Sequence, residues 1–327
     1  MRKVFTVLSI VAAMSLLLVA CDGESKPKVA LFLARGGLGD KAFNDDANAG
    51  LQKAAQDLGV DVTIFDFQQE SQDANIRKAA QSGYGLIIAL GSENSQTIQT
   101  VSEEFPETKF AIIDATVDGL NVTSVTFSEL EGDFLAGALA ALLSENGKVG
   151  YLGGADVLVI RRIQFGFEQG VKYVNPDAEI VVQYIGGVDD FSGFAKPDDA
   201  NKIATQMYAD GVDAIYAAAG GSTLGAIDAA SSAGLPIVTT GSDQRYLATE
   251  VIATSRTKNM NQTVYMLIEM FMQGKLQSGT IQLDYKSGGI GIAPLADFVP
   301  DSVINEFDSI RKDVESGKII VQPFTGQ

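Results

Sequence analysis

Residues 85–114 read GLIIALGSENSQTIQTVSEEFPETKFAIID, and residues 213–243 read DAIYAAAGGSTLGAIDAASSAGLPIVTTGSD. Both stretches have the same order of features: an apolar run, a loop rich in Gly or Ser, an amphipathic segment, a second apolar run and a final Asp. Short apolar runs separated by amphipathic segments are typical of parallel strands that helices cover on both faces. The two stretches therefore predict two copies of one strand–helix–strand unit.

The similarity continues on the N-terminal side of both stretches. There, residues 29–50 (VALFLARGGLGDKAFNDDANAG) correspond to residues 148–170 (KVGYLGGADVLVIRRIQFGFEQG). In the first of these two segments the apolar residues recur at intervals of three and four, as on a helix that lies against a sheet. They are Phe43, Ala47, Leu51, Ala54 and, just beyond the segment, Leu58. The chain thus follows the same βαβ rhythm twice.

This rhythm predicts an α/β fold with two doubly wound, Rossmann-like lobes joined by a hinge. We assign residues 28–126 and 252–285 to the N-terminal lobe, and residues 127–251 and 286–327 to the C-terminal lobe. The chain would then cross between the lobes near residues 126, 252 and 285. In doubly wound sheets the loops at the carboxyl ends of the strands line the binding crevice, so two such lobes can hold a ligand between them.

The N-terminus has the features of an export signal. Residues 1–20 contain two basic residues and then an apolar run, which is too short and too poorly flanked for a membrane-spanning helix. The run ends in LVAC, and this ending, with the only cysteine of the chain at Cys21, resembles the box in which bacterial lipoproteins are acylated. We expect a lipoprotein signal peptide at 1–20, lipidation of Cys21 and a polar tether at 21–27. An uncleaved anchor and a simply secreted protein are the alternatives, and both leave the cysteine unexplained.

Composition excludes several classes of function. The chain has 24 basic and 41 acidic residues and a formal net charge of −17, and such a surface repels the phosphates of nucleic acid. It has no histidine, which excludes a Ser-His-Asp triad, a Cys-His pair and an imidazole metal site. We expect no catalytic residues, no metal, no cofactor and no nucleic-acid partner.

The loop GGLGDKAFND at residues 36–45 is the first candidate for a binding site. A phosphate site is a poor interpretation, because the loop is acidic and lacks both the GxGxxG spacing and a GK[ST] sequence. The acids instead suit a neutral polyol or an amino-bearing ring, since carboxylates accept hydrogen bonds from O–H and N–H groups. Phe43 would offer a flat apolar face. Asp40 as a plain helix N-cap and Phe43 as a plain apolar contact remain alternatives.

The loop and several other segments together resemble the family of bacterial basic membrane lipoproteins, the purine nucleoside receptor group. The further matching segments are KFAIID, NVTSVTF, EGDFLAGALAALLSENGKVGYLGG, GFEQGV, AAGGSTLGAIDAA and GGIGIAP, and they extend the resemblance over residues 28–295. The resemblance implies a type I periplasmic-binding-protein fold. It also implies a monomeric, lipid-anchored receptor on the extracytoplasmic side of the cell membrane, which captures a nucleoside and delivers it to an ABC permease and its ATPase.

The resemblance implies a base held between two aromatic rings. Asp40, Phe43 and Asn44 fall on the family's loop, and Phe43 would form one face of this sandwich. The second face falls on Phe194 in FSGFAKPDDA, with Phe191 as the competing choice. Stacking contributes about 1–3 kcal/mol per base but accepts any base, so it would set the class of ligand and not its identity.

Three further residues are implied as ligand contacts. Asp243 resembles the acid that binds both ribose hydroxyls, although it could be only a loop cap. Asp114, its counterpart in the other half, would meet the base or the sugar. Lys286 in DYKSGG corresponds to a lysine near the ligand, but it could equally be a solvated side chain. The chain departs from the family at 244–246, QRY, and in an arginine pair at 161–162. We expect this pair to lie in a loop that approaches the cleft, where it could favour an anionic group. Both departures put the ligand's identity in doubt.

Other functions are compatible with parts of the sequence. The same fold could bind a pentose, a hexose or a signal molecule, and a lipid-anchored protein could act as an adhesin or as the input of a sensor. A nucleoside hydrolase is disfavoured, because its acids would have to cluster around a metal. Here the acids are dispersed along both halves, without a DxDxxxDD-type run.

Overall fold

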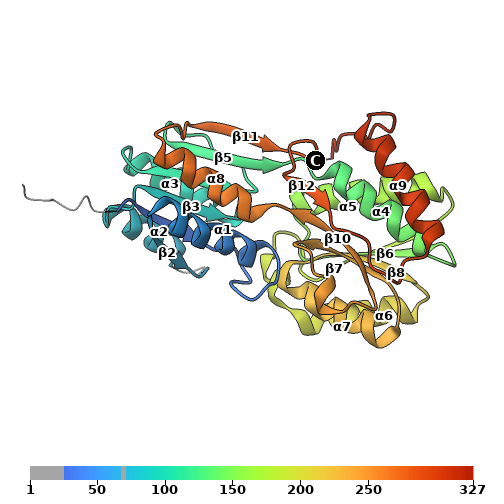
Figure 1. Cartoon of the computed structure of the whole chain (residues 1–327). Coiled ribbons are helices and arrows are strands. Elements are labelled where there is room, and N and C mark those ends of the chain that lie inside the picture. The colour runs from blue at the N-terminus through green and yellow to red at the C-terminus, as the bar shows by residue number, and fades with distance from the viewer. Residues whose placement is uncertain (1–25, 68–70, 327) are drawn as a thin grey trace, which may run out of the picture.

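The computed structural model describes residues 26–67 and 71–326. The predicted signal peptide, Cys21 and the tether up to residue 25 lie outside the described residues. Two α/β lobes lie end to end, and their sheets are separate (Figure 1). In the described residues no helix combines the length and the apolar character that a membrane span requires.

The first lobe has a six-stranded parallel sheet in the order β11-β5-β4-β3-β1-β2. Its strands are β1 (Lys28–Phe32), β2 (Asp61–Phe65), β3 (Leu86–Leu90), β4 (Lys109–Ile113), β5 (Val122–Phe127) and β11 (Gly279–Leu283). Its helices are α1 (Phe43–Leu58), α2 (Gln72–Gln81), α3 (Ser95–Glu104) and α8 (Met260–Met272).

The apolar pattern of this lobe follows from its layers. Successive strand residues point to opposite faces, so Val29 and Leu31 pack into the cluster under α1 and α8, and Ala30 and Phe32 pack into the cluster under α2 and α3. All five residues of β3 are buried. A strand with helices on both faces is therefore apolar along its whole length instead of alternating.

The second lobe repeats this plan, in the order β12-β10-β9-β8-β6-β7, with only β12 antiparallel to its neighbour. Its strands are β6 (Lys148–Gly153), β7 (Glu179–Tyr184), β8 (Ala214–Ala218), β9 (Ile237–Gly241), β10 (Ile252–Lys258) and β12 (Ile290–Ile292). Its helices are α4 (Leu130–Leu143), α5 (Leu158–Val174), α6 (Pro197–Ala209), α7 (Thr223–Ala233) and α9 (Asp301–Glu315).

The chain crosses between the lobes three times: from β5 to α4, from β10 to α8 and from β11 to β12 (Figure 1). The boundary predicted at residue 252 is wrong. Strand 252–258 pairs with β9 in the second sheet, so the second crossing follows Lys258. The physical reason is that an apolar strand followed by a helix has the same pattern in either lobe, and only its hydrogen-bonded neighbour decides which sheet it joins.

The predicted fold class is confirmed, because each lobe has a doubly wound sheet. Both sheets have their central strands in the order 2-1-3-4-5 when numbered from the start of the lobe. In such sheets ligands bind beyond the carboxyl ends of the strands, where the strand order reverses. In this molecule that position is next to β1 and β3 in one lobe and next to β6 and β8 in the other.

Candidate functional site: a cavity between the lobes

A cavity with an empty volume of about 800 Å³, part of it open to solvent, lies between the carboxyl ends of the two sheets. Both lobes contribute to its lining, which consists of Ala34, Arg35, Asp40, Ala42, Phe43, Asn44, Gly91, Ser92, Glu93, Asp114, Val159, Ile160, Ile163, Phe191, Phe194, Ala218, Gly220, Thr240, Gly241, Arg256 and Lys258.

Asp40 organises the loop before α1. Its carboxylate accepts hydrogen bonds from the backbone N–H groups of Ala42 (2.9 Å), Asn44 (2.9 Å) and Asp45 (3.1 Å), and from Nδ2 of Asn44 (3.0 Å). Burial raises the pKa of Asp40, although these bonds oppose the shift. Asn44 in turn accepts the N–H of Ala34 at 2.9 Å. Four bonds occupy the acceptor capacity of one carboxylate, so Asp40 acts mainly as a cap that begins the helix.

Aromatic rings enter the cavity from both lobes. Phe43 comes from the first turn of α1, and Phe191 and Phe194 come from a short 3₁₀ helix at Phe191–Ala195 in the second lobe. The rings of Phe191 and Phe194 are 6.3 Å apart and tilted by 37°. Phe194 lies directly over Gly154, where a Cβ atom would be only 2.3 Å from its ring. Among the described residues no ring contact joins Phe43 to either phenylalanine across the cavity.

An ionic cluster lies beside the hinge. Nζ of Lys258, at the end of β10, donates to both carboxylate oxygens of Asp114 (2.9 and 2.8 Å) and to Oε1 of Glu129 (3.0 Å). Nη2 of Arg162 donates to the other oxygen of Glu129 at 2.8 Å. Burial alone raises the pKa of Glu129, but Lys258, Arg162 and Arg256 together lower it below its usual value. The cluster therefore connects the first lobe, the crossing segments and α5 through charged groups.

A second buried ion pair lies at the base of the cavity. Nε of Arg256 donates to Oδ1 of Asp133 at 2.8 Å, and the hydroxyl of Tyr216 donates to the same oxygen at 2.6 Å. Asp133 and Arg256 are 0% and 1% exposed. Burial raises the pKa of Asp133 to about 6, although Arg256 opposes this shift.

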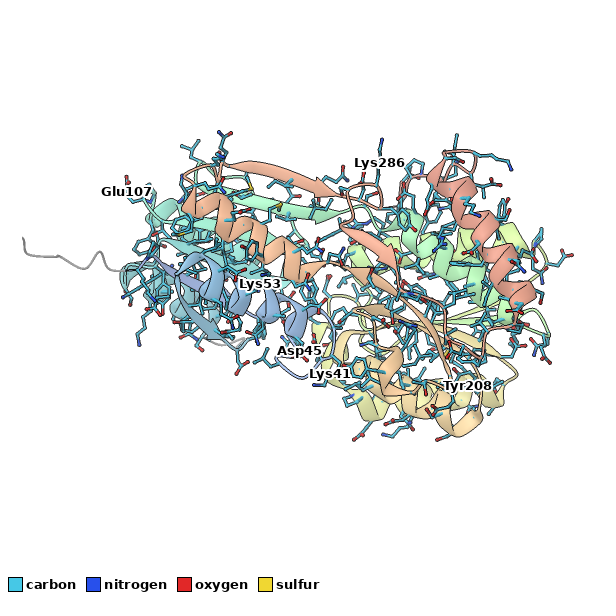
Figure 2. The ribbon with its side chains drawn as sticks, viewed as in Figure 1. Lys41, Asp45, Lys53, Glu107, Tyr208 and Lys286 are labelled. Atoms are coloured by element: carbon cyan, nitrogen blue, oxygen red, sulfur yellow. The ribbon has the colours of Figure 1, made fainter. Side chains whose placement is uncertain are left out.

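The two lobes also touch directly at the edge of the cavity. The carbonyl oxygen of Lys41 accepts hydrogen bonds from Oγ of Ser242 (2.9 Å) and Nε2 of Gln244 (3.1 Å). Next to these contacts, a Cβ atom on Gly241 would lie 2.6 Å from Cβ of Ala42, and Gly241 has a φ of +107°. The lobes therefore meet closely enough to enclose the cavity on this side. Figure 2 shows Lys41 and Asp45 at this junction.

Comparison with known proteins gives one family for nearly the whole chain. Residues 26–323 match the model of a family described as ABC transporter substrate-binding protein PnrA-like. The chain belongs to this family.

Relatives and solved structures agree with this assignment. The chain is 31% identical to basic membrane protein A of Borreliella afzelii, over 93% of this chain and 95% of that protein. It is also 31% identical to a CD4+ T-cell-stimulating antigen of Listeria monocytogenes, over 96% of each. A crystal structure of an ABC transporter solute-binding protein from Aeropyrum pernix is 25% identical, with a TM-score of 0.82, and the match covers 92% of this chain and 94% of that one.

Membership in the PnrA-like family determines the general class of function. The family consists of substrate-binding proteins of ABC transporters and is not a class of enzymes. It implies a small-molecule ligand, an ABC permease as partner and a place outside the cytoplasm.

The structure brings five of the residues predicted from the sequence to one cavity. They are Asp40, Phe43, Asn44, Asp114 and Phe194. Phe191, the competing choice for the second ring, lines the same cavity.

Two predicted residues lie elsewhere. Asp243 does not line the cavity; its side chain is 42% exposed, and Arg245 binds it through Nη2 at 2.7 Å. This bond also lowers the pKa of Asp243. Lys286 is exposed on the loop between β11 and β12 and points outward in Figure 2. Both assignments followed sequence correspondence alone, which does not show where a loop turns after its strand.

The arginine pair is also placed differently from expectation. Arg161 and Arg162 lie in α5 and not in a loop, and neither lines the cavity. Arg161 pairs with Asp156, and Arg162 pairs with Glu129. The pair therefore does not offer a site for an anionic ligand.

Sequence reasoning missed Lys258 and Arg256, the two basic residues of β10 that line the cavity. A signal was present, because the strand IATSRTK carries two basic residues in an otherwise small and apolar or hydroxylated run. Charged side chains are buried mostly when they are paired, and their acidic partners, Asp114, Glu129 and Asp133, are far away in the sequence.

Proposed function

We propose that this chain is a lipid-anchored receptor that captures nucleosides, in particular purine nucleosides, in the cavity between its lobes. An acyl chain on Cys21 holds the receptor at the cell membrane, and the receptor delivers its ligand to an ABC permease and ATPase. It acts as a monomer, without a cofactor.

One observation carries this proposal: aromatic rings from both lobes line the same cavity. Phe43 comes from the first lobe and Phe194 from the second. Among the described residues neither ring stacks on the other, so both can take part in stacking on a ligand. Stacking on two rings supports a base, since each stacked base gains about 1–3 kcal/mol.

The sugar of the nucleoside needs a different partner from the one predicted. Asp243 is outside the cavity, whereas Asp114 and Lys258 line it. Nζ of Lys258 already donates its three hydrogen bonds to Asp114 and Glu129, but the carboxylate of Asp114 can accept further bonds from ribose hydroxyls. We assign the diol to Asp114, which Lys258 holds in place.

The first test is calorimetry with the purified mature protein and a panel of nucleosides, free bases and free pentoses. We expect nucleosides to bind and free pentoses to fail, because stacking is absent without a base. Native mass spectrometry of the freshly purified protein should reveal a co-purified nucleoside. Binding of free sugars without nucleosides would support the sugar-binding alternative and contradict the proposal.

The second test removes one ring. Phe43→Ala should weaken nucleoside binding at least about fivefold, which corresponds to the loss of about 1 kcal/mol. Phe298→Ala is the matched control, because Phe298 is 38% exposed and does not line the cavity. An affinity of the Phe43→Ala protein within about threefold of the wild type would contradict the stacking model.

A further inference from the structure

We propose that Arg256 determines which purine the cavity accepts. Its two terminal nitrogens bind the acceptor edge of a 6-oxopurine, the O6 and N7 atoms, and thereby select guanine and hypoxanthine nucleosides over adenine nucleosides. This inference rests on the proposed nucleoside function and specifies the ligand of the same site.

The hydrogen bonds of Arg256 leave the two terminal nitrogens of its guanidinium group without protein partners among the described residues. We call these two nitrogens the fork. Only Nε has protein partners in the described residues: Oδ1 of Asp133 at 2.8 Å and the hydroxyl of Tyr216 at 3.3 Å. Nη1 is buried and has no partner among those residues, and no hydrogen bond of Nη2 to a described residue is formed. Arg256 lines the cavity and is 1% exposed; in our proposal its unused donors face the ligand.

A buried donor without an acceptor is costly, typically about 1–3 kcal/mol, and buried polar groups in native proteins nearly always have partners. Asp133 could have satisfied the fork with a second bond, since its Oδ2 is also without a partner among the described residues. Instead the carboxylate accepts from Nε of Arg256 and from the hydroxyl of Tyr216, but from neither terminal nitrogen of Arg256. These contacts hold the side chain in place while Nη1 has no partner among the described residues.

The charges around Arg256 favour a neutral acceptor over an anion. Arg256 belongs to a group of three cations and three carboxylates within or beside the cavity, and their charges balance. The members are Arg162, Arg256, Lys258, Asp114, Glu129 and Asp133. An additional negative charge would meet no uncompensated cation in this group. A carbonyl oxygen and a ring nitrogen can accept the two hydrogen bonds without adding charge.

The cavity that Arg256 lines is apolar along α5, and the aliphatic part of the Arg256 side chain is closely packed. Ile160 and Ile163 of α5 line the same cavity, and Gly132 is so close that a Cβ atom there would lie 3.1 Å from Cγ of Arg256. Arginine binds O6 and N7 of guanine in a bidentate manner, whereas adenine presents an amino group in place of the carbonyl. The amino group is a donor and would oppose one N–H of the fork. A matched bidentate pair discriminates by about 1–3 kcal/mol.

The test is calorimetry of the mature protein with guanosine, inosine, adenosine and 7-deazaguanosine, which lacks N7. We expect guanosine and inosine to bind about tenfold or more tightly than adenosine, within the range of such pairs. We expect 7-deazaguanosine to be intermediate. Arg256→Lys should reduce the preference for guanosine over adenosine to about twofold or less, because a lysine keeps the charge but not the planar fork.

A second variant keeps the test valid if Arg256→Lys folds poorly. The double variant Arg256→Met, Asp133→Asn removes the fork together with the charge that it balances, and it should also lose the preference. Arg161→Lys is the matched control, since Arg161 lies on α5 outside the cavity, and it should keep the preference. Thermal unfolding verifies that each variant is folded.

The outcomes separate the two proposals. Equal wild-type affinities for guanosine and adenosine, or a preference that survives in both Arg256 variants, would overturn the role of Arg256 and leave the nucleoside function intact. Failure of every nucleoside to bind would overturn the proposed function itself, and the assignment of Arg256 with it.

Discussion

At the scale of single residues, two aspartates of the first lobe that line the same cavity have different tasks. Asp40 uses its oxygens on the backbone of its own loop. Asp114, with a φ of +68°, instead holds Lys258 across the hinge. A non-glycine residue in the left-handed region is uncommon and costs energy. The ion pair with Lys258 helps to hold Asp114 in this conformation.

Replacing Asp40 by Asn should destabilise the protein by about 1–2 kcal/mol, because an amide has one acceptor oxygen where the loop uses two. The measurement is chemical denaturation of the ligand-free protein. Asp57→Asn is the control, since Asp57 forms only a surface pair with Lys53, and it should change the stability by less than about 0.5 kcal/mol. An equal effect of both variants would show that Asp40 is not a cap.

Ligand affinity should depend on the protonation of Asp46. Burial and then repulsion from Asp40 and Asp45 raise the pKa of Asp46 from 3.8 to about 6, although Ser242 of the other lobe opposes this shift. If the closing of the two lobes on a ligand supplies part of this burial, closing takes up a proton and is favoured when Asp46 is neutral. The contribution of Asp46 to ligand affinity is then complete at a pH below the pKa that Asp46 has in the open protein. It is lost as the pH rises through about 6, the pKa of Asp46 in this structure.

The measurement is the dissociation constant between pH 4.5 and 8. Affinity should fall as the pH rises to about 6 and stay level above it, and Asp46→Asn should flatten this part of the profile. An unchanged profile in the variant would assign the pH dependence to another group, such as Asp133, whose burial raises its pKa to about 6 as well.

At the scale of elements, the second lobe depends on a very close contact between α4 and α5. A Cβ atom on Gly137 would lie 2.0 Å from the carbonyl oxygen of Phe167, and one on Gly170 would lie 1.9 Å from that of Phe134. The backbones of the two helices therefore touch. α5 also carries Ile160 and Ile163 into the cavity, so this contact sets the position of one wall of the site.

Gly170→Ala should force the two helices apart and cost about 1–3 kcal/mol, which lowers the melting temperature by several degrees. Differential scanning calorimetry measures this change. Gly187→Ala is the control, because an added Cβ there meets no atom within 4 Å. A Gly170→Ala protein as stable as the control would mean that the helices separate without cost.

At the scale of the whole molecule, three crossing segments join two lobes that also touch across the cavity. The lobes are held together on that side by the contacts of Ser242 and Gln244 with the carbonyl of Lys41. We expect this arrangement to be the closed state of a hinge, in which a ligand enters when the contacts open.

Gly241→Ala should hinder closure, since the added Cβ would lie 2.6 Å from that of Ala42. Small-angle X-ray scattering should show a smaller decrease in the radius of gyration on ligand addition, and the affinity should fall. Gly211→Ala is the matched control, because Gly211 has a φ of +90° but open space around it. Equal effects of both variants would attribute the loss to backbone strain and not to the meeting of the lobes.

Most of the fold could be predicted from the sequence, whereas only part of the site could. Phe43 and Phe194 were found because they fall on loops that resemble those of the family, and Asp114 because it follows an apolar run that repeats between the halves. Asp243 satisfies the same criterion and still lies outside the cavity, since its loop turns so that Arg245 binds it. Lys258 and Arg256 were missed because their partners are more than 100 residues away.

The sequence by itself determined the two-lobed α/β architecture, because periodicity and burial on both faces of a strand are local properties that repeat along the chain. It also determined which loops reach the carboxyl ends of the strands. Only the tertiary structure decided the sheet to which strand 252–258 belongs and the pairing of the buried charges, since both depend on which distant segments lie side by side. The burial of Arg256 belongs to this second group, because it depends on the three-dimensional position of the carboxylate that binds it.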